Sequence, residues 1–362
     1  MNDLEKAREI INEVDAEMAK LFEKRMAASK MIAGYKMQNG LSIFDPAREK
    51  EVIRKASAVI EDDEIRAYYV NFLRNTMDVS KNYQRKIIEG MKVAYCGTEG
   101  AYAHIATCKL FPTAKKIAYK DFPSAYAAVE SGECDVAVLP TENSYNGEVG
   151  QVTDLLFSGE LYINNMFDLA VSHDLLGTPD SKIEDITDVV SHSQALGQCA
   201  DYIRKNDFTP HEYTNTALAA KHVAEKGDKT LAAIASAEAA EIFGLKVLAR
   251  NINASRSNTT RFAVLSRSQC KMTKGKMDAH SVLLFTVKNE AGALAKALEI
   301  IGEYGFNMKT LRSRPMKELL WQYYFYIEIE GNIHSEMGKE MLSRLDAYCD
   351  RIKLTGTFNK ID

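Results

Sequence analysis

The first helix that the sequence predicts carries a permanent positive charge where its pattern favours an apolar residue. Counting in sevens from Leu4 and from Ala7 gives two apolar seams, and Arg25 falls on the first of them. An inward guanidinium is costly unless it is paired, and Lys36, eleven residues later, lies roughly 20° from the same face. Two inward cations predict a pocket for an anionic ligand. Arg25 alone leaves an alternative open, in which its side chain reaches the helix edge and pairs with a carboxylate.

Two more predicted helices add polar groups to this region. The second places Pro46 at a first helical position behind an Asp45 cap. The third, from about residue 65 to 88, carries Ser80 and Gln84 at i and i+4 and therefore on one face. The polar set across the three helices comprises Arg8, Arg25, Lys36, Asp45, Arg48, Glu49, Ser80 and Gln84.

This polar set resembles that of the all-helical chorismate mutases, over about the first ninety residues. The resemblance implies an all-α three-helix bundle in residues 1–90 that binds chorismate and rearranges it to prephenate without covalent chemistry. Arginines bind carboxylates with a fixed fork geometry, and Lys36 and Gln84 would donate hydrogen bonds to the ether oxygen, where negative charge builds. The resemblance also implies an intertwined dimer in which the partner supplies Arg8. Within one chain, Arg8 lies roughly 100° around the helix from Arg25.

The resemblance assigns catalytic roles to six of these residues and substrate binding to two. The catalytic set is Arg8, Arg25, Lys36, Arg48, Glu49 and Gln84, and the binding set is Asp45 and Ser80. Paired carboxylates are commonly structural. Two roles therefore stay open for Asp45 and Glu49, and also for Glu142 farther along the chain: each either touches substrate or holds the cations in place.

Length and composition set limits on the rest of the chain. Its 362 residues are too many for one such bundle and predict two or three domains. The net charge of −4 argues against a nucleic-acid partner. We see neither a secretory signal nor a run long enough to span a membrane. Six scattered cysteines without CxxC pairs predict free thiols in a cytoplasmic chain.

Beyond Gly90, short apolar strands alternate with helices, which predicts an α/β unit. Open α/β sheets bind ligands at the carboxyl ends of their strands. Three polar runs follow predicted strands in this way, and a fourth precedes the predicted strand at 262–265. They are the loop at Gly97 and Gly100, PTENSYNG at 140–147 after a strand at 135–139, SHSQALGQC at 191–199, and NTTRF at 258–262. Each run alone has an ordinary explanation, such as a tight turn or a Ser191 helix cap.

Together with IASAEAAEIFGL at 234–245, these runs resemble the prephenate dehydratase domain, over residues 91–268. The resemblance implies an α/β two-lobed, periplasmic-binding-protein-like fold that closes on prephenate, which loses carbon dioxide and water to give phenylpyruvate. It implies neither a metal nor an organic cofactor. Thr260 is the implied proton donor to the departing hydroxyl, and Arg261 a carboxylate anchor. The orienting residues are Asn143, Ser191 and Gln198.

Two positions in this region need separate comment. Family members usually carry a small hydroxyl residue where this chain has Ala103, so one hydrogen bond to substrate would be missing or would come from His104 or Tyr102. Cys199 lies within a polar run, but no predicted base stands beside it. We expect Cys199 to be a packing residue.

The last part of the chain, residues 279–362 after a polar linker, predicts the order βαββαβ of an α+β ferredoxin-like unit. Two runs make this unit resemble the regulatory ACT domains. The resemblance implies that these runs form a phenylalanine site between paired domains. They are Gly292, Ala293 and Leu294, and then Arg312, Ser313, Arg314 and Pro315. The second run usually begins with Glu, so Arg312 would weaken capture of the ligand's ammonium group or disturb the interface.

The three resemblances together predict a bifunctional enzyme of phenylalanine biosynthesis, a homodimer or higher homo-oligomer, with L-phenylalanine as effector. Two alternatives stay open. One is a dehydratase whose helical segment only dimerises, and the complete polar set from Arg8 to Gln84 argues against it. The other is a non-catalytic sensor of small molecules. Thr260 and Arg261 favour catalysis, because a sensor needs no acid at an elimination site.

Overall fold

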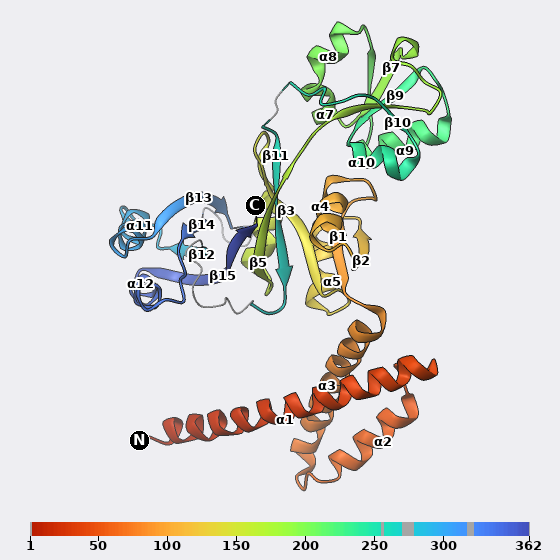
Figure 1. The fold of residues 1–362 in the computed structure, drawn as a ribbon. Helices are drawn as coiled ribbons and strands as arrows, with labels where there is room; N and C mark the ends of the chain where they lie inside the picture. Colours follow the sequence, from red (N-terminus) through yellow and green to blue (C-terminus); the bar gives the residue numbers. More distant parts are fainter. Residues whose placement is uncertain (1, 255–256, 270–278, 317–321, 362) are drawn as a thin grey trace. The chain divides into compact units, whose positions relative to one another are not determined.

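The computed structural model describes residues 2–254, 257–269, 279–316 and 322–361 (Figure 1). The chain divides into two compact units, Met1–Lys92 and Val93–Asp362. Most of the predicted linker before residue 279 lies outside the described residues. Within the described part, no helix is both long and apolar enough to cross a lipid bilayer.

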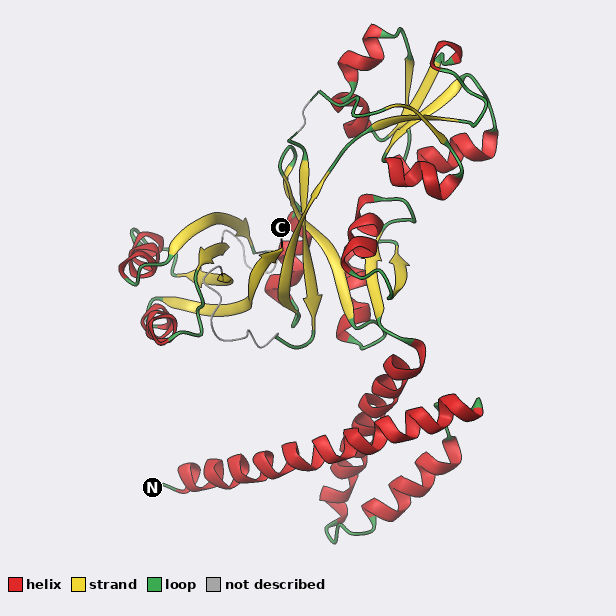
Figure 2. Cartoon of the chain, in the orientation of Figure 1, coloured by secondary structure: helices red, strands yellow, loops and turns green. Residues whose placement is uncertain are grey.

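The first unit consists of three helices, as predicted (Figure 2). They are α1 (Asp3–Asn39), α2 (Pro46–Ser57) and α3 (Asp63–Glu89). Asn2 and Glu5 form a capping box at the start of α1, and Gly40 ends it in a left-handed conformation. Asp45 caps α2 with Pro46 in its first turn. Within this unit α2 and α3 lie beside the second half of α1, whereas the first half of α1 has no described helix of the unit beside it (Figure 1).

The second unit begins with two lobes, each built around its own sheet. Lobe A contains β1 (Lys92–Cys96), β2 (Lys115–Tyr119), β3 (Val136–Asn143), β4 (Gly147–Glu148), β5 (Tyr162–Ala170) and β11 (Thr259–Ser266), with helices α4 (Tyr102–Leu110), α5 (Phe122–Glu130) and α6 (Gly150–Ser158). Its strands run in the order β5-β11-β3-β1-β2, with β4 paired to β3.

Lobe B has the strand order β10-β6-β9-β7-β8. Its strands are β6 (Asp174–Gly177), β7 (Asp188–Ser191), β8 (Thr209–Glu212), β9 (Leu231–Ala235) and β10 (Lys246–Ala249), and its helices are α7 (Ser193–Gln198), α8 (Ala200–Lys205), α9 (Thr216–Lys226) and α10 (Ala237–Phe243), with a 3-10 turn at Ile183–Asp185. The chain passes from lobe A to lobe B after β5 and returns before β11, so two crossing segments join the lobes (Figure 1).

The remaining elements form the C-terminal module, with the predicted order βαββαβ. They are β12 (Ala279–Val287), α11 (Ala293–Glu303), β13 (Asn307–Pro315), β14 (Tyr323–Glu330), α12 (Glu336–Asp346) and β15 (Cys349–Ile361). The sheet order β13-β14-β12-β15 is that of a ferredoxin-like fold. Residues 317–321, which include the predicted start of β14, lie outside the described residues.

The C-terminal module is joined to lobe A by backbone pairing. The end of β15 runs parallel to β5, with Lys360 opposite Met166 and Ile361 opposite Phe167. The sheet of lobe A thereby continues into the sheet of the module. A shared core follows, because Phe157 of α6 stacks on Tyr324 of β14 with ring centroids 4.2 Å apart. The module therefore packs directly against lobe A.

Candidate functional site

In the helical unit the structure brings Arg25 of α1 to Ser80 of α3. The guanidinium donates hydrogen bonds to the Ser80 hydroxyl and, at 3.1 Å, to the Thr76 carbonyl. Burial lowers the pKa of Arg25, but a guanidinium keeps its charge in proteins. No carboxylate pairs with it among the described residues, so the alternative of a salt bridge at the helix edge is wrong.

Gln84 lies one turn beyond Ser80, and both side chains are more than nine-tenths buried. Its Oε1 atom has no hydrogen-bond partner within the described chain. Buried polar atoms of folded proteins are normally paired. Gln84 thus keeps a buried hydrogen-bond acceptor that the fold does not use.

The other predicted residues of this unit have local partners. Lys36 Nζ donates to the Ile43 carbonyl at 2.6 Å, and Asp45 accepts from the Arg48 backbone as the α2 cap. The Arg48 guanidinium pairs with Glu51 at 2.7 Å, and Glu49 pairs with Lys81 at 2.7 Å. The carboxylate of Asp45 therefore has a structural role at the helix terminus, and Glu49 holds a cation from α3.

Arg8 lies far from this cluster within one chain. It precedes Arg25 by seventeen residues of one continuous helix, which is about 25 Å along the axis. The first half of α1 is exposed, and the only buried residues of the described helix are Ser29 and Ala33. A single chain therefore does not bring Arg8 to the cluster.

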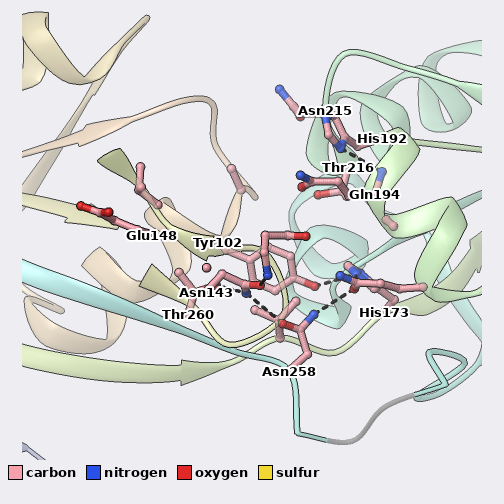
Figure 3. A pocket seen from close by; sticks show the side chains of 17 residues that line it. Tyr102, Asn143, Glu148, His173, His192, Gln194, Asn215, Thr216, Asn258 and Thr260 are labelled. Carbon is pink, nitrogen blue, oxygen red and sulfur yellow. Dashed lines mark hydrogen bonds between the residues drawn. The ribbon is translucent and has the colours of Figure 1, made fainter. Parts of the chain in front are cut away.

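The main cavity of the second unit lies between the two lobes and has a volume of about 520 Å³ (Figure 3). Lobe A and the crossing segments line it with Ala101, Tyr102, Asn143, Asn146, Gly147, Glu148, Val149, Val171, His173, Asn258 and Thr260, and lobe B lines it with His192, Gln194, Ala195, Gln198, Asn215 and Thr216. No lysine or arginine belongs to this described lining.

The sequence predicted that the strand ends before the PTENSYNG run, but the first residues of this run belong to β3. Strand β3 continues through Asn143, because β11 pairs with it as far as Thr260 opposite Asn143. The Asn143 amide donates to the Thr260 hydroxyl at 2.9 Å and to Asn258 Oδ1 at 2.9 Å. Since the hydroxyl oxygen accepts from Asn143, its own proton is free to be donated to a molecule in the cavity.

His173 and Asn258 extend this network, although the sequence analysis assigned them no role. His173 Nε2 lies 2.9 Å from Gln198 Oε1, which also accepts from the Asn258 amide at 2.9 Å. Burial lowers the pKa of His173 and keeps the ring neutral. A chain of hydrogen bonds thus runs from His173 through Gln198, Asn258 and Asn143 to Thr260 (Figure 3). A signal was present in the sequence, because His173 stands in the short polar run Ser172-His173-Asp174 after β5.

Helix amino termini face the same cavity. Ala101 and Tyr102 begin α4, and Asn215 and Thr216 begin α9. Free N–H groups at such termini attract anions. The Asn215 side chain accepts from the Leu218 backbone at 2.7 Å and orders this end of α9. The cavity can therefore hold carboxylates with backbone donors.

Two predicted dehydratase residues lie elsewhere. Ser191 is fully buried and donates to the Ile234 carbonyl at 2.5 Å, and it neither lines the cavity nor caps α7, which His192 does. Arg261 follows Thr260 on β11 and therefore points to the opposite face of the sheet. There it donates to Asp168 at 2.9 Å, and this hydrogen bond raises the pKa of the guanidinium. Orienting by Ser191 and direct anchoring by Arg261 are thus corrected by the structure.

The glycine loop shows where Ala103 and its two neighbours lie. Gly97 and Gly100 have φ values of 107° and 82°, which favour glycine. Ala103 is buried and does not line the cavity, while His104 accepts from the Gly100 backbone at 3.2 Å. Tyr102 does line it, and its hydroxyl donates to the Ser172 carbonyl at 2.5 Å.

Neither reactive thiols nor metal ligands gather at this cavity. Burial raises the pKa of the Cys199 thiol to about 12, so almost none of it is thiolate at neutral pH. No group of three or more His, Cys, Asp or Glu side chains that could hold a metal occurs among the described residues. Cys199 is a packing residue of lobe B, as expected.

The predicted effector residues separate into two places within one chain. Gly292 and Ala293 start α11, and Leu294 lines a pocket of about 200 Å³ in the C-terminal module. Arg314 instead pairs with Asp154 of α6 at 2.8 Å, and Arg312 pairs with Glu142 of β3 at 2.5 Å. The second run therefore contacts lobe A and not the α11 pocket.

Comparison with known proteins supports the resemblance of the first unit to chorismate mutases and of the second to prephenate dehydratases. The chorismate mutase type II family matches residues 7–85, and the prephenate dehydratase family matches residues 93–270. A bifunctional chorismate mutase/prephenate dehydratase of Aquifex aeolicus is 31% identical over 99% of this chain and 99% of its own length.

Solved structures resemble the second unit. GqqA, described as a novel type of quorum quenching acylase, is 31% identical with a TM-score of 0.70 over 75% of this chain and 98% of its own. Prephenate dehydratase of Arthrobacter aurescens, solved with L-Phe, is 24% identical with a TM-score of 0.68 over 74% of this chain and 90% of its own, which shows the fold. With both domains present in order and a relative matched from end to end, the chain belongs to the bifunctional chorismate mutase/prephenate dehydratase family.

Proposed function

We propose that this chain rearranges chorismate to prephenate in its helical unit and converts prephenate to phenylpyruvate between lobes A and B. The observation that carries the second step is the hydrogen bond from the Asn143 amide to the Thr260 hydroxyl at the cavity wall. It leaves the hydroxyl proton directed to a ligand. The corresponding observation for the first step is Arg25 beside the buried side chains of Ser80 and Gln84.

For the rearrangement, the protein binds a dicarboxylate in a compact conformer and stabilises charge that develops on the ether oxygen. Arg25 would hold a carboxylate, and Gln84 and Lys36 would donate to the ether oxygen. The donor for this role is the NH2 group of the Gln84 amide, and the buried Oε1 atom, which has no partner within the described chain, would accept from a hydroxyl group of the substrate. Lys36 would exchange its bond to the Ile43 carbonyl for one to substrate.

The mutase site would be completed by a second copy of the chain. Apolar residues along the free half of α1 are between 40% and 65% exposed, namely Leu4, Ile10, Ile11, Val14, Met18 and Leu21. A helix that leaves such a stripe exposed is a candidate interface. Pairing α1 with the α1 of a partner would cover this stripe and would let Arg8 enter the partner's site.

For the elimination, the bond from the ring to its carboxylate breaks and releases carbon dioxide. The electron pair enters the ring, and the ring C–O bond breaks as the hydroxyl takes a proton and leaves as water. Thr260 is positioned to donate that proton, and aromatisation drives the reaction. Gln198, held by His173 and Asn258, would orient the substrate, and the amino termini of α4 and α9 would bind its carboxylates.

The C-terminal module would bind L-phenylalanine as a feedback effector. Support comes from its βαββαβ fold, from the pocket beside Leu294, and from the related dehydratase that was solved with L-Phe. In one chain the two predicted effector runs are separate, so the site would form where two modules pair.

The test is to supply purified protein with chorismate alone and to identify the products. Phenylpyruvate is expected, because both sites are in one chain. Prephenate without phenylpyruvate would reject the role of the Asn143–Thr260 pair. Unchanged chorismate calls for a second incubation with prephenate, and inactivity there too would favour a sensor. Saturating phenylalanine is expected to slow the dehydratase step, and an unchanged velocity would reject the feedback.

A further inference from the structure

The sheet of lobe A has two functional faces near its active site. Asn143 and Thr260 lie on the face that lines the cavity. Their chain neighbours Glu142 and Arg261 are opposite each other across β3 and β11 and point to the other face, because side chains alternate along a strand. On that other face, Arg312 and Glu328 of the C-terminal module contact Glu142 and Arg261.

Glu142 is held by Arg312 of β13. Arg312 Nη2 lies 2.5 Å from Glu142 Oε1, and the side chains are 17% and 34% exposed. The guanidinium also lies over the ring of Tyr326, 5.6 Å from its centroid. An ion pair that is partly buried and stacked is ordered by more than one contact. Arg312 is therefore fixed against lobe A, although the resemblance to ACT domains placed its run in the effector site.

The charges around this pair explain why a cation is needed there. Arg261 already contacts Asp168 at 2.9 Å and Glu328 at 3.4 Å. Glu328 also has His280 at 2.9 Å. Without Arg312, Glu142 would lose its close partner, and the nearest guanidinium, that of Arg261, is already engaged by Asp168 and Glu328. An unpaired carboxylate in a partly buried position turns toward water, and it would move the end of β3 with it.

We propose that Arg312 is a positioning residue for the dehydratase site, which acts through Glu142 to hold Asn143 in place for Thr260. Glu142 and Asn143 are adjacent in β3, and Asn143 is the residue that orients the Thr260 hydroxyl. A displacement of Glu142 therefore displaces the amide that sets the proton donor. The inference rests on the proposed dehydratase function, and it makes the C-terminal module part of the catalytic architecture even when no effector is bound.

The experiment compares Arg312→Gln, Arg312→Lys and Arg312→Glu in the full chain, with prephenate as substrate and no phenylalanine. Misplacement of a reacting group by about 1 Å costs on the order of 100-fold, so Arg312→Gln is expected to lower dehydratase kcat between about 10- and 100-fold. KM should change less than about threefold, because Arg312 does not line the cavity. Arg312→Lys keeps the charge and should restore part of the rate, and Arg312→Glu should be the slowest because it repels Glu142.

A matched control is Arg344→Gln. Arg344 also forms an ion pair at 2.5 Å, with Glu303, but both partners belong to helices of the C-terminal module. Its dehydratase kcat is expected to stay within about twofold of wild type, since exposed pairs contribute little. Mutase activity of each preparation reports whether the helical unit is intact, and thermal unfolding reports on the second unit. If Arg312→Gln unfolds that unit, Glu142→Gln removes the same pair from the other side and is expected to give the same loss of kcat.

Three results would overturn the proposal. The first is an Arg312→Gln enzyme whose kcat equals that of Arg344→Gln. The second is an equal loss in Arg312→Lys and Arg312→Gln, which would point to a steric role. The third is a change confined to the phenylalanine response, which would make Arg312 an effector contact. An inactive wild-type chain would instead reject the proposed function itself, so the two failures are distinguishable.

Discussion

The two sites differ in how much of each a single chain supplies. In the helical unit, the cluster around Arg25 and Ser80 lacks Arg8, and the apolar stripe of α1 is exposed. In the second unit, one chain provides a cavity of about 520 Å³ with a hydrogen-bond network that reaches Thr260. A long helix cannot bury its own apolar stripe, whereas two lobes joined by two segments can close on each other. We therefore expect the first site to depend on association and the second to function within one chain.

The strongest test of separate sites is Arg25→Ala. It removes the cation that the fold places beside Ser80, so mutase kcat/KM is expected to fall by about 10²–10³-fold. Dehydration of supplied prephenate should be unchanged, because no residue of that cavity lies in the helical unit. Product analysis with each substrate separately measures both. A folded variant that lost both activities would contradict the two-site description.

The reciprocal change is Thr260→Ala. Loss of a positioned proton donor is expected to lower the dehydratase rate by about 10²–10⁴-fold, with mutase activity retained and prephenate accumulating from chorismate. Thr260→Ser keeps the hydroxyl that Asn143 orients and is the matched control. Equal rates for the Ala and Ser variants would show that the hydroxyl is not the proton donor.

A third test separates association from chemistry. Leu21→Glu puts a charge on the exposed stripe of α1, where Leu21 is 65% exposed in one chain. Burying an unpaired carboxylate in an interface is costly, so dimers should dissociate and mutase activity should fall by about tenfold or more at low protein concentration. Dehydratase activity per chain should persist. Val59→Glu, at a 77% exposed position beyond α2, is the control, and sedimentation measures the mass.

The smallest expected effect is a pH dependence of stability in the second unit. Burial lowers the pKa of both His173 and His104 in the folded chain, while an unfolded histidine titrates near pH 6.5. The unfolded state therefore binds more protons below about pH 6.5, and stability is complete above that pH and declines as the pH falls. Urea unfolding at pH 7.5 and 5.5 is expected to show a weaker decline for His173→Gln than for the exposed His334→Gln. An identical decline in both would exclude His173 as a cause.

Sequence patterns were sufficient for the helical unit, because helix periodicity relates residues that are close in sequence. The spacing placed Ser80 and Gln84 on one face of the third helix and pointed Arg25 inward from the first, and the structure brings Arg25 to Ser80. The patterns were weaker in the second unit. Gln198 and Thr260 line the cavity as expected. His173 was not identified from the sequence, and Ser191 is buried and does not line the cavity.

By itself, the sequence determined the three resemblances, the order of the elements and the identity of the polar runs, since these depend on residue type and local spacing. Tertiary structure decided which way the residues within those runs point. The continuation of β3 through Asn143, with a register shift that leaves Thr141 of β3 without an opposite residue on β11, sends Asn143 and Thr260 to the cavity and Glu142 and Arg261 to the C-terminal module. The physical reason is that alternate side chains of a strand face opposite sides, and only the pairing of distant strands sets which side is which.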